Sequence, residues 1–104
     1  MTNLFWTGYS AQDRYATISL LQAAVAPFGD IIGFQPFSDL ALTVTIELPE
    51  RNIDALYEAL SSVAGMDPAP STASVSGRER TIYFHINFAR GTGNLQTETP
   101  AVPG

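Results

Sequence analysis

The chain has 104 residues, which is enough for one compact domain and too few for two. Apolar residues make up 45% of it, so a hydrophobic core can form, and the ten acidic residues outnumber the five arginines to give a net charge of −5. This charge disfavours binding to nucleic acid and to anionic membrane surfaces, because both need a positive protein surface. The sequence contains no cysteine, which excludes disulfides, thiol catalysis and cysteine-ligated metals.

The first residues contain no basic segment followed by a long apolar run, so no secretory signal is visible. The longest apolar stretches are also far shorter than a membrane span. We therefore expect a cytoplasmic protein with no membrane partner.

The N-terminal half of the chain predicts a strand, a helix and a second strand. Residues 3–9 are rich in aromatic side chains and predict the first strand. A helix is predicted to follow and to end at Pro27, because apolar side chains recur at helical spacing: Tyr15, Ile18, Leu20, Leu21 and Val25. Residues 30–37 predict the second strand, and Pro36 places it at a sheet edge because proline cannot donate to a ladder.

The C-terminal half predicts strand, helix and strand again. Residues 40–48 alternate strictly between apolar and polar side chains, which is typical of a half-buried strand. The helix after Pro49 is predicted to stop at Gly65. Residues 67–77 predict a flexible loop, and the alternation resumes in a final strand at 81–88. The single domain is expected to span residues 1–90, with a disordered polar tail at 91–104.

The order strand, helix, strand, strand, helix, strand predicts an α+β fold of the ferredoxin-like βαββαβ type. In this fold a four-stranded antiparallel sheet carries two helices on one face. One sheet face would then stay uncovered with aromatic side chains on it, and the second strand would be an open edge. Both features favour a homodimer.

The junction between the first strand and the first helix, residues 7–16, carries a recognisable motif. Thr7 and Gly8 end the strand, and Asp13 and Arg14 begin the helix after a short loop. This pattern resembles ACT-type regulatory domains, especially those that precede bacterial phosphoserine phosphatases. The resemblance covers roughly residues 3–66, but Tyr15 replaces a proline of that family and Ala16 replaces a glycine.

The resemblance implies a stand-alone regulatory or ligand-sensing domain, not an enzyme. Such domains pair side by side and hold an amino acid or similar small carboxylate. The free N–H groups at a helix N-terminus could receive this carboxylate, or Ser10 and Asp13 could cap them internally. An extra methyl at Ala16 would hinder the approach of a ligand. The candidate ligand-binding residues are Gly8, Tyr9, Ser10, Asp13, Arg14 and Ala16.

The only histidine, His85, gives an alternative site. It lies on the polar face of the last strand beside Tyr83 and Asn87, where it could serve as a general base in a small dimeric ferredoxin-like enzyme. It could equally be a polar residue at an interface, in a structural module without any ligand. One histidine offers no metal ligand set, so we expect no metal, no cofactor and no catalytic residues.

Two further groups of residues are not expected to form a functional site. The carboxylates Glu47, Glu50, Asp54 and Glu58 were expected to be solvated surface charges. The segment Phe37–Asp39 was expected to form a turn that Asp39 closes.

Overall fold

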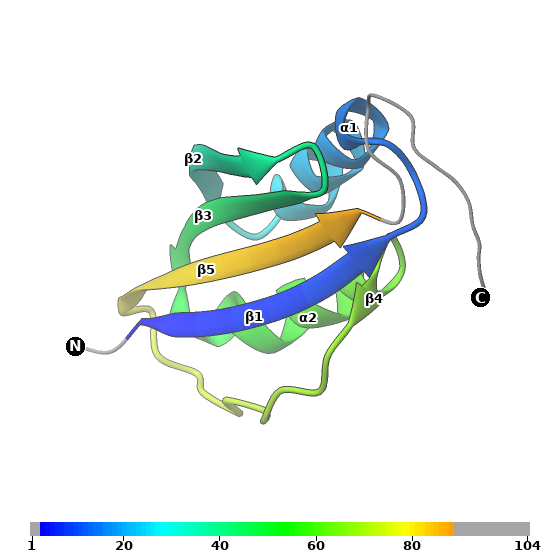
Figure 1. Ribbon diagram of the computed structural model, residues 1–104. Helices are drawn as coiled ribbons and strands as arrows, with labels where there is room; N and C mark the ends of the chain where they lie inside the picture. Colours follow the sequence, from blue (N-terminus) through cyan, green and yellow to red (C-terminus); the bar gives the residue numbers. More distant parts are fainter. Residues whose placement is uncertain (1–2, 89–104) are drawn as a thin grey trace.

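The structure is a computed structural model that describes residues 3–88. The elements follow in the order β1 (Leu4–Ser10), α1 (Arg14–Val25), β2 (Asp30–Ser38), β3 (Ala41–Pro49), the 3₁₀ turn η1 (Glu50–Asn52), α2 (Ile53–Ser61), β4 (Gly65–Met66) and β5 (Glu79–Phe88). One mixed sheet contains all five strands, and both helices lie behind it (Figure 1). The predicted tail at 91–104 lies outside the described residues.

The sheet corrects the predicted topology. Residues 3–88 form an α+β fold with two helices, but the strand order is β2-β3-β5-β1-β4 and β5 runs parallel to β1. The expected four-stranded antiparallel, ferredoxin-like sheet is therefore wrong. Each helix does link two parallel strands that are not neighbours, β1 to β2 and β3 to β4. The long last strand, however, is a fifth strand that lies between β3 and β1 (Figure 1).

The direction of β5 follows from the segment that precedes it. The two-residue strand β4 pairs antiparallel with β1 and takes the place expected for the last strand. Residues 67–78 then lead the chain back to the opposite end of the sheet (Figure 1). From there β5 can only run antiparallel to β3 and parallel to β1.

The hydrophobic core lies between the sheet and the helices. Alternate residues of β3 and β5 are buried, as the sequence pattern predicts, and α2 contributes Ile53, Leu56 and Leu60. Trp6 of β1 and Leu21 and Val25 of α1 complete this core. Each fully buried side chain of this size stabilises the fold by about 1.5–3 kcal/mol relative to exposure. The strand members are Leu42, Val44, Ile46, Leu48, Ile82, Phe84, Ile86 and Phe88.

The helices differ from prediction in one side chain of the buried face and in the residue that ends α2. Tyr15 is 72% exposed, because the buried face of α1 is formed by Thr17, Leu21 and Val25 instead. Gly65 does not end α2 in a left-handed conformation, since no glycine among the described residues has positive φ, and it begins β4. Neither helix in this part of the chain is long and apolar enough to cross a membrane.

Candidate functional site

The junction at residues 7–16 is largely satisfied by its own side chains. The Asp13 carboxylate accepts a hydrogen bond from the backbone N–H of Ala16 at 2.8 Å and thereby caps α1. The buried hydroxyls of Ser10 and Thr17 are 2.7 Å apart, and Ser10 Oγ also accepts from the backbone N–H of Gln12. The junction thus uses for its own structure several groups that a ligand would need.

Gly8 has a packing role in the structure. A Cβ atom at this position would lie 2.8 Å from the backbone oxygen of Gly65 and 2.8 Å from Cε1 of Phe84. Glycine therefore allows β4 and the Phe84 ring to approach β1 closely. This close packing is a sufficient reason for a glycine at position 8, and no ligand is needed to explain it.

The two remaining candidate residues of the junction, Arg14 and Tyr9, interact with other parts of the protein. The Arg14 guanidinium donates to the backbone oxygen of Ser38 and to the Asp39 carboxylate, so it ties α1 to the turn after β2. Tyr9 lies on the other face of the sheet and is 52% exposed. The negative charge of Asp67, together with a hydrogen bond to it, raises the pKa of the Tyr9 phenol.

The sheet face opposite the helices, called the open face below, carries the alternative candidates. Tyr83, His85 and Asn87 alternate with the buried residues of β5 and share this face with Phe5 and Thr7 of β1. Among the described residues no helix covers it, and Phe5 is 76% exposed. The open face is therefore an accessible surface with an apolar part.

A shallow hollow of about 370 Å³ lies on the open face. Phe5 stacks on Tyr83 with ring centroids 5.4 Å apart, and Phe37 contacts the His85 ring at 5.5 Å. These two aromatic pairs line the hollow, together with Thr7, Thr43 and Trp6. No aspartate, glutamate, lysine or arginine lines it.

His85 is oriented by a threonine. The Thr43 hydroxyl and Nδ1 of His85 are 3.1 Å apart on neighbouring strands, which fixes the plane of the imidazole. Within residues 3–88, Nε2 of His85 has no hydrogen-bond partner. The ring can therefore offer one nitrogen, as donor or acceptor according to its tautomer, to a group bound in the hollow.

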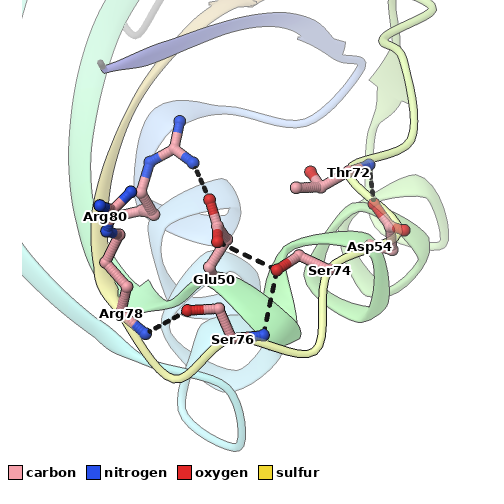
Figure 2. A network of polar contacts seen from close by, with 7 residues as sticks. All are labelled: Glu50, Asp54, Thr72, Ser74, Ser76, Arg78 and Arg80. Carbon is pink, nitrogen blue, oxygen red and sulfur yellow. Dashed lines mark hydrogen bonds and ion pairs between the residues drawn. The ribbon is translucent and has the colours of Figure 1, made fainter. Parts of the chain in front are cut away.

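The carboxylates Glu50 and Asp54 are structural and not simply solvated, which corrects the interpretation from the sequence. Figure 2 shows Glu50 between Arg80 and Ser74, and Asp54 bonded to the backbone N–H of Thr72. These bonds attach residues 71–78 to the start of α2. The hydrogen bond from Ser74 lowers the pKa of Glu50, and so do the hydrogen bond from Arg80 and its positive charge.

Comparisons of the chain with protein-family models, with curated proteins and with solved structures find no match. Residues 3–88 also contain no group of three or more side chains suited to holding a metal ion. The likeness to ACT-type domains thus rests on the sequence motif, and function has to be argued from the geometry.

The sequence identified part of this geometry. It placed Tyr83 and His85 on one polar face, and the structure brings them together. It missed Phe37, which was assigned to a turn but lies in a bulge of β2 between Pro36 and Ser38 and contacts His85. The available signal was the presence of Phe5 and Phe37 at positions where a solvated strand would carry polar side chains.

Proposed function

We propose that this protein is a non-catalytic, ligand-sensing module that holds a flat, neutral, ring-bearing ligand in the hollow on its open face. The observation that carries this proposal is the combination of aromatic walls with one oriented imidazole nitrogen that has no hydrogen-bond partner within residues 3–88. Small-molecule sites are typically concave, mostly apolar and fitted with a few polar groups that fix orientation. The hollow has each of these features.

The charge of the site favours a neutral ligand. Its lining contains no acidic residue, lysine or arginine, and the chain as a whole is negative, with a net charge of −5. A carboxylate ligand would meet no arginine there, and Arg14, the arginine among the residues proposed from the sequence, is bonded to Asp39. A ring with one hydrogen-bonding atom directed at Nε2 of His85 suits the site better.

We propose further that the working form is a homodimer in which two open faces meet and enclose the hollows. The carboxylates that β3 and β5 carry on this face, Glu47 and Glu79, do not line the hollow. Two negatively charged copies can therefore bring their hollows together with little electrostatic repulsion. The edge of β2 is a poorer contact, because two bulges and Pro36 interrupt its regular pairing.

Amide NMR spectra recorded during titration with neutral aromatic fragments, such as indole and quinoline, test the ligand site. Shifts should concentrate on Phe5, Thr7, Thr43 and His85 and should saturate. The variant Phe37→Ser removes one wall and should abolish the response. The matched control is Tyr15→Ser, which removes an exposed aromatic side chain of α1. Equal responses in both variants, or shifts scattered over the chain, would contradict the proposal.

A further inference from the structure

A second concave site lies on the helix side of the sheet. This groove of about 290 Å³ separates α2 from residues 69–71, and Trp6 of β1 lines it. Its walls on α2 are Asp54, Tyr57 and Glu58. The groove is separate from the hollow proposed above, since the Trp6 side chain belongs to the core on the helix side of the sheet.

The two walls of the groove are bonded to each other. The Tyr57 hydroxyl donates to the backbone oxygen of Asp67 at 2.6 Å. The Asp54 carboxylate accepts from the Ser71 hydroxyl at 2.6 Å and from the backbone N–H groups of Thr72 and Ala73 at 2.9 and 3.0 Å. The segment is thus fixed to α2 on both sides of the opening, so the groove is preformed.

The charge in the groove is negative. Asp54 and Glu58 line it, and no arginine does. The hydrogen bonds from Ser71, Thr72 and Ala73 lower the pKa of Asp54, so its carboxylate is ionised at neutral pH. Glu58 is exposed and forms no ion pair within the described residues. A cation would therefore be attracted to this opening and an anion repelled.

The aromatic side chains are arranged to receive such a cation. The rings of Trp6 and Tyr57 meet edge to face, with centroids 5.3 Å apart and planes at 80°. Trp6 is only 7% exposed and its indole N–H donates to no described residue, but its nitrogen still reaches the surface, since Arg14 Nε is the only fully buried side-chain nitrogen or oxygen of residues 3–88 without a partner. A buried tryptophan usually finds an acceptor for this hydrogen. A bound molecule that carries an oxygen would supply one.

We propose that this groove binds a small organic ammonium group with a nearby oxygen acceptor. The cation would lie against the Trp6 and Tyr57 rings, where the ring quadrupole attracts it, and Asp54 and Glu58 would balance its charge. The oxygen would accept the indole hydrogen of Trp6. Choline has both groups as a free molecule. A methylated lysine side chain presents the same ammonium group within a peptide, where a backbone carbonyl of the peptide would have to supply the oxygen.

The protein contains its own reporter for this site. Trp6 is the only tryptophan of the chain and lines the groove, so a ligand bound there should change the intrinsic fluorescence. Titration of the full chain with choline should give a saturable change in emission. The neutral carbon isostere 3,3-dimethylbutan-1-ol has the same shape and hydroxyl and should bind about tenfold more weakly, because it lacks the charge. Equal binding of the two molecules would overturn the proposal.

A matched pair of variants separates the groove from general charge effects. Glu58→Gln removes an exposed groove carboxylate and should weaken choline binding about two- to fivefold. Asp30→Asn changes the net charge equally on β2, at the far edge of the sheet, and should leave binding unchanged. An equal loss in both variants, or no loss in Glu58→Gln, would refute the site.

A third titration, with N-acetyl-trimethyllysine methylamide, identifies the source of the ammonium group. Tighter binding than choline would indicate a methylated peptide, and weaker binding a free small molecule. The result is independent of the open-face hollow, so failure of one site leaves the other proposal intact.

Discussion

The ring of Phe84 fills the space in which residue 8 would carry a side chain. Cε1 of Phe84 lies 2.8 Å from the position of a Cβ atom on Gly8, and the backbone oxygen of Gly65 is equally close. This contact joins β5, β1 and β4 at one point. It therefore links the most buried aromatic residue of the core to the strand that begins the chain.

Gly8→Ala should destabilise the fold. The new methyl group overlaps both a core ring and a backbone atom, and overpacking of this kind typically costs about 1–3 kcal/mol. Urea unfolding would measure the loss. The control is Gly33→Ala, since a Cβ atom on Gly33 meets nothing within 4 Å, and it should leave stability unchanged or raise it by up to about 1 kcal/mol. Equal stability of the two variants would refute this account of Gly8.

The acid stability of the protein should depend on Asp54. Its folded-state pKa is lowered by hydrogen bonds from Ser71, Thr72 and Ala73. The stabilisation is therefore complete above the unfolded pKa of about 4 and is lost as the pH falls through the lower folded pKa. Asp54→Asn should be less stable at pH 7 and should show a flatter pH dependence below pH 4.

Ser71→Ala serves as a graded control for that experiment, because it removes only one of the hydrogen bonds to Asp54. Its acid profile, followed by thermal melts between pH 7 and pH 2, should fall between those of the parent and Asp54→Asn. Superimposable profiles for all three proteins would show that the carboxylate contributes nothing.

The junction at residues 7–16 should prove structural. Asp13→Ala removes the helix cap and should lower the free energy of unfolding by about 1 kcal/mol. Ala16→Gly removes the methyl group that hinders a ligand, yet we expect no heat on calorimetric titration with amino acids, because Asp13 already occupies the Ala16 amide. Heat with Ala16→Gly, and none with the parent, would restore the junction as a carboxylate site.

Light scattering at micromolar concentrations should give twice the chain mass of 11.2 kDa. The double variant Phe5→Ser, Phe37→Ser should be a monomer, because it removes the two most exposed aromatic side chains of the open face. Tyr15→Ser, on α1, should stay dimeric. A parent protein that scatters as a monomer would remove the homodimer.

The sequence predicted the elements better than their arrangement. The alternation around Val44 and Phe84 identified both central strands and their buried faces, since a period of two has only one interpretation in a half-buried strand. The position of β5 was not predictable in this way. Antiparallel and parallel neighbours of a central strand require the same alternation, so the pattern carries no information on partner or direction.

The one available indication was the length of the segment before β5. The segment 67–78 is longer than a tight connection before a strand requires. The strand β4 has only two residues, which are too few for a periodic pattern. For the candidate sites, too, the sequence pattern predicted the face on which a residue lies but not the residues that it contacts. His85 could be placed on a face, but its contact with Phe37 depends on a bulge in β2, which no periodicity reveals.

The central place of β5 has a consequence for biosynthesis. Among the strands of residues 3–88 it is the last to be synthesised, yet its hydrogen bonds join the β2–β3 pair to the β1–β4 pair. A nascent chain that ends before residue 79 would expose two unpaired strand edges, on β3 and on β1, and such edges recruit other copies of the chain. We therefore expect the sheet to fold only after β5 has been synthesised. A stop codon ahead of β5 should yield an aggregate and not a smaller domain.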